Sequence, residues 1–349
     1  MVMNTVYTGS TPVTVDLVLV HELSGDVVDS WKSPVTGVVW AKHLLPLSPD
    51  INQESFRVLS FGYNGNATVA IRPAPPGRNT VDENASDLLS ELHSARQGQP
   101  TDRPIIFVAH GYGGLMVKAA SISQAAIGVI FLATPHSGAG NFNMWEDIET
   151  PATGLTPKRY NVQVAADMRW GSSTVSRIAR DFIDVASGGL QIVSISETLP
   201  SRAISGGTFI LVSAINSRVN HVNETTRSLA AKHYDMTVAD NRDDPRFLSL
   251  AGEIGRILKT FRDGTGPKKP DTITPEVVTP DGTVQPGPLT ADQLRTLYQA
   301  AFRRWDLGTA VYYNEQFIQL LSATKGVNDP EALKERENWK TLRTYQGYK

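Results

Sequence analysis

The residues from Pro104 to Lys118 constrain the fold of this chain more than any other stretch. An apolar run over 105–109, rich in branched side chains, leads into a glycine-dense turn over 111–114, and a helical pattern follows. This order predicts a buried strand, a sharp turn and a helix in direct succession. Such a turn lies at the end of a buried strand, so its residues stand at the edge of a sheet.

The same three parts make up a nucleophile elbow, which is written G-x-S-x-G when it carries serine. In this chain Gly111 stands at the serine position. The frame of the motif is therefore intact, but the reactive oxygen is missing. The rest of the sequence decides whether the chain still expects a serine there.

Apolar runs with the length of strands alternate with helical patterns along most of the chain. This alternation predicts an α/β fold with a mostly parallel sheet and helices on both of its faces. The predicted strands are Val13–Val20, Phe56–Phe61, Ile105–Ala109, Gly128–Ala133, Leu190–Ile195 and Phe209–Ser213. The predicted helices are Trp40–Leu47, Val81–Arg96, Asn223–Ala231 and Phe247–Phe261.

The composition excludes several classes of function. Hydrophobic residues make up 40% of the 349 residues and charged residues 19%, as in soluble globular proteins. The net charge of −2 gives no electrostatic reason to expect nucleic acid as a partner, and the absence of cysteine excludes disulfides and thiolate catalysis. The longest apolar stretch, near 125–133, is too short to span a membrane, and the N-terminus lacks the pattern of a signal peptide. We expect a cytoplasmic protein with no integral membrane span.

A change in composition divides the chain near residue 264. Six prolines fall between Gly264 and Thr290, without apolar periodicity, which predicts an extended linker. The expected organisation is a catalytic domain over 1–263, a Pro-rich linker over 264–289 and a helical extension over 290–349. Because about 60 residues make only a marginal core, we expect these helices to dock on the same chain or to form a homodimer.

A serine hydrolase of this fold needs a nucleophile, an acid and a histidine, in that order along the chain. Glu197 follows a predicted strand, and His233 lies between the last predicted strand and the last helix of the domain. In the predicted triad, the residue at 111 attacks an acyl carbonyl, His233 takes the proton and Glu197 orients the imidazole. Outside such a site, Glu197 would be a solvated loop carboxylate and His233 a histidine at a helix end.

Backbone N–H groups must stabilise the oxyanion that develops during acyl transfer. We expect these donors to be Tyr112, directly after the nucleophile position, and Leu23, in the loop after the first strand. No cluster has convincing spacing for metal ligands and no glycine-rich phosphate loop follows a strand, so we expect neither a metal nor another cofactor. The remaining histidines are interpreted as structural or lack a supporting context: His21, His43, His93, His110, His136 and His221.

At these residues the chain resembles the lipase-like serine esterase branch of the α/β-hydrolases. That group includes the serine-active-site-containing proteins and the hydrolase domains of many fungal multidomain proteins. The matching segments are Val20-His21-x-Leu23, Trp31, Leu44–Pro46, Arg57–Tyr63, Arg103–His110, Gly113–Lys118, Val129–His136 and His233–Pro245. The resemblance covers roughly residues 13–262. It implies an α/β-hydrolase fold and ester, thioester or acyl-transfer chemistry through a serine, without a cofactor.

Two positions depart from the pattern of this family. Glu22 stands where the family has glycine in His-Gly-Leu, which puts a side chain on the loop that should supply the Leu23 donor. Glu22 is therefore a candidate for altering access to the oxyanion hole or for lining the pocket. Gly111 stands where the family has the serine, so an acyl-enzyme of the serine type cannot form.

Three hypotheses follow from the missing serine. In the first, Gly111 inactivates an otherwise complete esterase, thioesterase or acyltransferase. In the second, the chain is a natural pseudoenzyme that binds a ligand or partner in the old pocket. In the third, His233 acts as a general base without a covalent intermediate.

The interval 139–189 lies where α/β-hydrolases insert a cap over the pocket. Its aromatic residues, among them Trp145 and Trp170, are candidate pocket residues, or they simply pack the cap onto the core. As pocket residues they would favour an apolar ester, lactone or thioester as the small-molecule partner.

Overall fold

The computed structural model describes residues 1–51, 54–63, 80–120, 125–139, 162–267, 276–278, 284–286, 291, 294–295, 298, 307–325 and 329–337. The chain divides into two compact units, Met1–Lys268 and Lys269–Lys349. The first unit contains all the residues that the sequence nominates for catalysis.

A seven-stranded sheet forms the centre of the first unit, in the order β1-β3-β2-β4-β5-β6-β9. All neighbouring strands run parallel except β1, which pairs antiparallel with β3. The strands are β1 (Val2–Thr8), β2 (Val15–Val20), β3 (Phe56–Gly62), β4 (Ile105–His110), β5 (Ala126–Leu132), β6 (Gln191–Glu197) and β9 (Glu224–Leu229).

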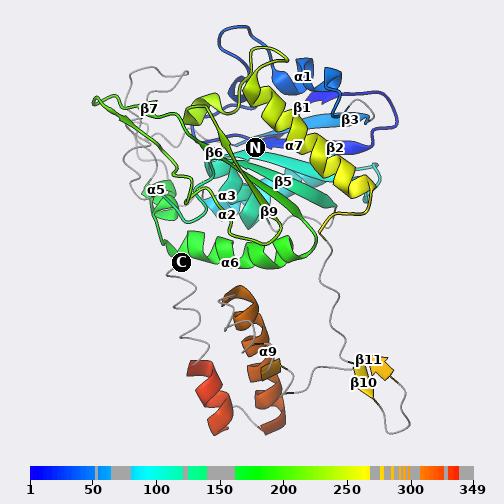
Figure 1. Ribbon diagram of the computed structural model, residues 1–349, viewed down its shortest axis with the longest axis vertical. Coiled ribbons are helices and arrows are strands. Elements are labelled where there is room, and N and C mark those ends of the chain that lie inside the picture. The colour runs from blue at the N-terminus through cyan, green and yellow to red at the C-terminus, as the bar shows by residue number, and fades with distance from the viewer. Residues whose placement is uncertain are drawn as a thin grey trace. The chain divides into compact units, whose positions relative to one another are not determined.

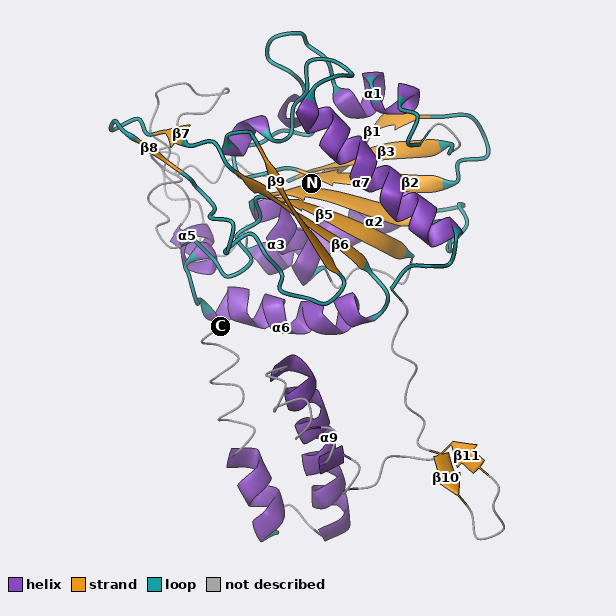
Figure 2. Cartoon of the chain, in the orientation of Figure 1, coloured by secondary structure: helices purple, strands orange, loops and turns teal. Residues whose placement is uncertain are grey.

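Helices cover both faces of this sheet. The ribbon shows α7 crossing one face, while α2 and α3 lie on the other (Figure 1). Among the described residues, the helices of the unit are α1 (Trp40–His43), α2 (Val81–Ala95), α3 (Tyr112–Ala119), α5 (Val162–Met168), α6 (Ser173–Ser187) and α7 (Pro245–Arg262). Short 3₁₀ turns are η1 (Asp29–Trp31), η2 (Leu45–Leu47) and η3 (His233–Asp235). The strand order and the layers are those of an α/β-hydrolase fold, so the predicted fold class is confirmed (Figure 2).

Side-chain caps set where the longer helices begin. Thr80 and Glu83 form a reciprocal capping box at the start of α2, in which each side chain accepts from the other residue's backbone N–H. Asp244 caps α7, and Pro245 occupies its first turn, where a missing N–H costs nothing. The predicted helices Val81–Arg96 and Phe247–Phe261 agree with α2 and α7 to within two residues at each end.

The pairing of β2 with β4 brings the two halves of the candidate site together. Val20 at the end of β2 lies opposite Ala109 near the end of β4, and both strands are buried along their whole length. In a parallel sheet the carboxyl ends of neighbouring strands meet at one edge. The loop that begins at His21 therefore faces the turn at Gly111.

The sequence prediction was wrong at the last strand of the sheet. Residues 223–231 were expected to form a helix, but Glu224–Leu229 forms the edge strand β9, which pairs parallel with β6. An edge strand keeps one side in solvent, so it lacks the apolar run by which the inner strands were found. Its two threonines, Thr225 and Thr226, are β-branched and favour the extended backbone.

The apolar run at 209–213 was also predicted wrongly, as an inner strand. Only Thr208–Phe209 is extended there, as β8, and it pairs with β7 (Ser201–Arg202) outside the main sheet. Leu211 and Val212 are buried within a loop instead. The Val212 N–H donates to the Glu197 carboxylate over 2.6 Å, so this buried loop holds the candidate acid.

The second unit contains helix α9 (Leu307–Lys325) and a short antiparallel hairpin of β10 (Glu276–Val278) and β11 (Val284–Pro286). The hairpin falls within the segment predicted to be an extended linker. A small apolar core joins Leu294, Phe317, Leu321 and Ala332. No helix in the described part of the chain is long and apolar enough to cross a membrane. The homodimer through these helices stays a prediction.

Candidate active site

The backbone at Gly111 has the conformation that a nucleophile elbow requires. Between β4 and α3, Gly111 adopts φ 50° and ψ −118°. Residues other than glycine adopt this backbone conformation only with strain. The next helix packs so closely on the end of β2 that a Cβ on Gly113 would lie 2.5 Å from the His21 carbonyl oxygen. The chain therefore keeps the sharp turn of a hydrolase although it lacks the serine.

The Glu22 side chain occupies the volume that a side chain at residue 111 would need. A Cβ built on Gly111 would lie 1.2 Å from Glu22 Oε2 and 2.3 Å from its carboxyl carbon. Glu22 is itself buried, with only 1% of its surface exposed. The two departures from the family pattern, 89 positions apart in the chain, are thus complementary in space.

Both predicted oxyanion donors bind this same carboxylate. The Tyr112 N–H donates to Glu22 Oε2 over 2.9 Å, and the Leu23 N–H donates to Glu22 Oε1 over 2.5 Å. The structure therefore brings the two predicted donors together on one carboxylate. They are engaged by a carboxylate of the chain itself, where an acyl-transfer site would leave them for the substrate.

His233 lies between Glu22 and Glu197. It begins the 3₁₀ turn η3 after β9, and its Nδ1 is 3.2 Å from Glu197 Oε1. Its Nε2 is 3.4 Å from Glu22 Oε2. All three side chains are buried, so the contacts lie in a medium of low polarity. The predicted acid and histidine meet, and Glu22 takes the third position of the triad.

The two carboxylates determine the charge of His233. Burial by itself lowers the pKa of this histidine, but Glu197 and Glu22 outweigh burial and raise the pKa to about 9. At neutral pH His233 is therefore an imidazolium that can donate from both nitrogens. A histidine in this state already carries the proton that a general base would have to accept.

Other histidines surround the centre. His110, the last residue of β4, lies beside His233 with ring centroids 4.6 Å apart and the rings tilted by 37°, and burial lowers its pKa well below 6.5. His21 stacks on Tyr63 at 4.3 Å and is likewise kept neutral by burial, which lowers its pKa to about 4. Glu22, His110 and His233 bring one ligand atom each to within 4.8 Å of one another. Sequence spacing did not reveal this group, because its members come from three separate strand ends.

The two aromatic pocket candidates lie apart from these contacts or outside the described residues. Trp170 follows α5 in a turn, and the residue is 64% exposed. Trp145 lies outside the described residues, as does most of the first half of the expected cap. The assignment of either tryptophan to a pocket stays a prediction.

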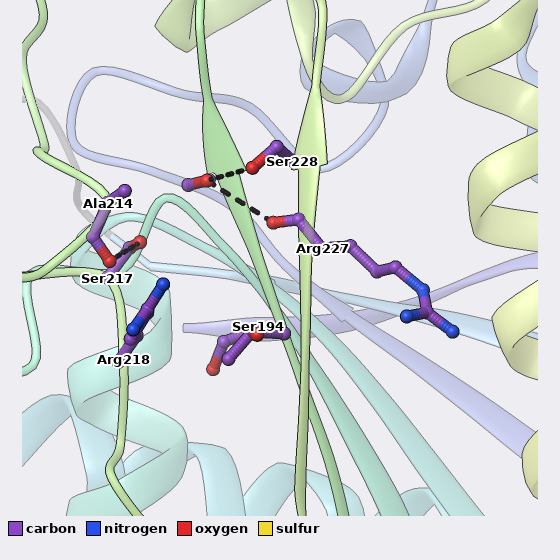
Figure 3. A pocket seen from close by; sticks show the side chains of 8 residues that line it. Ser194, Ala214, Ser217, Arg218, Arg227 and Ser228 are labelled. Carbon is purple, nitrogen blue, oxygen red and sulfur yellow. Dashed lines mark hydrogen bonds between the residues drawn. The ribbon is translucent and has the colours of Figure 1, made fainter.

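A small polar cavity of about 90 Å³ lies beside β6 and β9 (Figure 3). Figure 3 shows Arg218 and Ser217 on the loop before β9, opposite Ser194 of β6. The cavity is lined by Ser194, Ser196, Ala214, Ser217, Arg218, Thr226, Arg227 and Ser228. None of the triad positions lines this cavity. The hollow therefore does not open onto the candidate active site.

The site predicts a specific change in the pH dependence of stability. A raised pKa in the folded state stabilises the fold fully below pH 6.5, and that stability is lost as the pH rises through about 9. A shift of this size corresponds to about 3 kcal/mol at most, shared between Glu22 and Glu197. We expect the native chain to have a larger unfolding free energy than Glu22→Gln. This difference should be largest below pH 6.5 and should shrink as the pH rises to about 9.

Chemical denaturation of both proteins from pH 6 to pH 10 measures this difference. The comparison is needed because burial lowers the pKa of Lys118 to about 7. The contribution of Lys118 to stability therefore rises with pH in the same range, whereas that of His233 falls. Lys118 is common to both proteins and cancels. A difference that stays constant or grows with pH would contradict the contact between Glu22 and His233.

Comparison with known proteins gives distant relatives. No family model matches the chain. It is 24% identical to Protein SERAC1 of Bos taurus over 227 residues, a match that covers 57% of this chain and 33% of the relative. It is 26% identical to Protein SERAC1 of Mus musculus over 156 residues, covering 37% of this chain and 23% of the relative. The matched region thus spans a third or less of these relatives.

Solved structures of esterases are also similar. A lipase-esterase related protein from Clostridium acetobutylicum aligns with a TM-score of 0.45 at 12% identity, covering 74% of this chain and all of that one. Est1E of Butyrivibrio proteoclasticus, solved with ferulic acid, aligns with a TM-score of 0.43 at 14% identity. That alignment covers 75% of this chain and 96% of Est1E.

Proposed function

We propose that this chain is an α/β-hydrolase-fold protein whose catalytic centre is filled by its own Glu22. In this account it does not perform acyl transfer of the serine type, and the buried centre serves as a binding site. The observation that carries the proposal is the position of the Glu22 carboxylate, 1.2 Å from where a Cβ on Gly111 would lie. The same carboxylate also binds the Tyr112 and Leu23 N–H groups.

A single inactivating substitution at Gly111 fits this geometry less well. In that hypothesis the remainder of the site should stand ready for a serine. Instead a serine at 111 would collide with Glu22 unless the carboxylate left two backbone donors and His233. Each of those hydrogen bonds involves a charged group, and such bonds contribute about 1.5–3 kcal/mol apiece. The close fit of Glu22 into the space at Gly111 therefore supports the interpretation that the two departures from the family pattern form a matched pair.

General-base catalysis by His233 is also supported less well. Its Nε2, which would face a substrate or water, lies against Glu22 Oε2. Its pKa is raised to about 9, since the paired carboxylates outweigh the effect of burial. At neutral pH the imidazolium therefore predominates over the neutral imidazole that this hypothesis needs.

The proposed centre should bind a different class of ligand from a serine esterase pocket. If residue 111 were serine, the expected substrate would still be an apolar ester, lactone or thioester. With Glu22 in place, the donors that would bind the acyl oxygen are occupied. A buried carboxylate beside histidine rings favours a cation or a strong hydrogen-bond donor instead.

An acylation assay tests the proposal. The native chain and the Gly111→Ser variant are treated with a fluorophosphonate probe and with a panel of short and long activated esters and thioesters. We expect neither protein to be labelled, and each to hydrolyse the panel no faster than the same protein with His233→Ala. Labelling of the Gly111→Ser variant that depends on His233 would instead support a single inactivating substitution in a working esterase.

A further inference from the structure

We propose that Glu22, His110 and His233 form a binding site for a divalent transition-metal ion, with Zn²⁺ as the preferred ion. The ligand atoms would be Glu22 Oε2, His110 Nε2 and His233 Nε2. These three residues are the group whose ligand atoms lie within 4.8 Å of one another. The inference deepens the proposed function, because it names a ligand for the centre that Glu22 fills.

The unpartnered nitrogen of His110 is the observation that points to a ligand. His110 is 2% exposed, and its Nε2 has no hydrogen-bond partner among the described residues. The ring makes a hydrogen bond to the backbone of His233, which leaves Nε2 as the nitrogen that carries the lone pair. A buried polar atom without a partner costs about 1–3 kcal/mol. A metal ion would satisfy it.

His233 is oriented in the way that metal-binding histidines usually are. Its Nδ1 is held by Glu197 at 3.2 Å, and its Nε2 points to Glu22. A carboxylate behind the ring fixes the tautomer and raises the basicity of the coordinating nitrogen. Glu22 is in turn held by the backbone N–H of Leu23 and of Tyr112. Each of the three ligands thus has a fixed second contact.

To bind one ion, the three proposed ligand atoms must lie as close together as they do in a tetrahedral zinc site. Ligand bonds of about 2.0–2.1 Å place the atoms of a tetrahedral zinc site about 3.4 Å apart. Glu22 Oε2 and His233 Nε2 already lie 3.4 Å apart. His110 brings a ligand atom to within 4.8 Å of the other two, so it must approach them by up to about 1.4 Å.

The donor set selects the ion. Two imidazoles and one carboxylate are a ligand set that zinc uses in open sites, whereas calcium and magnesium prefer oxygen ligands only. Binding must displace the proton from His233 Nε2, so one proton is released or exchanged for each ion bound.

Cobalt titration of the full chain tests the site, since Co²⁺ substitutes for Zn²⁺ and reports its geometry by visible absorption. We expect one equivalent to bind, with the strong bands of a four- or five-coordinate ion, and Zn²⁺ to displace it. Glu22→Gln and His110→Gln should each lower the affinity on the order of 100-fold or more. His43→Gln and His93→Gln remove histidines outside the cluster and should leave binding unchanged.

Two results would overturn the site. One is the absence of the cobalt bands in a folded native chain. The other is their retention at native affinity in Glu22→Gln and His110→Gln, which would place the ion outside the cluster; their loss in the His43 or His93 variant would place it on the surface. Circular dichroism of each variant tests whether it is folded. If His110→Gln unfolds, Glu22→Gln still tests the site, because glutamine keeps the shape of the glutamate side chain. Failure here leaves the acylation result of the proposed function untouched.

Discussion

The double variant Glu22→Gly, Gly111→Ser is expected to react with a fluorophosphonate probe at least about 1,000-fold faster than Gly111→Ser alone. Serine at 111 supplies the nucleophile, and removal of Glu22 vacates the volume that its oxygen needs. The same change frees the Tyr112 and Leu23 N–H groups, which Glu22 binds over 2.9 and 2.5 Å. A single oxyanion donor is worth about 100–1,000-fold in related chemistry. Neither substitution alone supplies both parts.

Three matched variants control this experiment. Glu22→Gly alone should stay unreactive, because Gly111 has no oxygen. Adding His233→Ala or Glu197→Gln to the double variant should remove most of the gain, since the base and its orienting group act as a unit. Equal reactivity of the single and double serine variants would mean that Glu22 does not block the site.

Much of this fold could be predicted from the sequence because its inner strands carry an unmistakable pattern. β2 and β4 are buried along their whole length, so each reads as a continuous apolar run between turn residues. The glycine-dense turn at 111 fixed where the candidate site had to lie. β9 was missed because an edge strand exposes one side. β1 was missed because none of its residues is fully buried and they lack a strong apolar signal.

The sequence nominated residues that the structure brings together, but it did not predict the contacts of Glu22 with them. Motif order alone nominated Glu197 and His233, since the acid and the histidine follow the elbow in a fixed sequence. The rotamer that takes Glu22 into the space at Gly111 is set by three contacts that no sequence pattern encodes. The departures at 22 and 111 could have been read together, because the loop after β2 and the turn after β4 meet at one sheet edge.

A double-mutant cycle in unfolding free energy tests the central claim, that Glu22 and a side chain at residue 111 compete for the same volume. The cycle combines Gly111→Ala with Glu22→Ala and needs no assumption about activity. Alanine at φ 50° costs about 1–3 kcal/mol in either background through backbone strain alone. In the native background it must also displace a carboxylate that holds two backbone donors and His233. We predict a coupling of about 2 kcal/mol or more between the two changes, whereas additivity within about 0.5 kcal/mol would contradict the account.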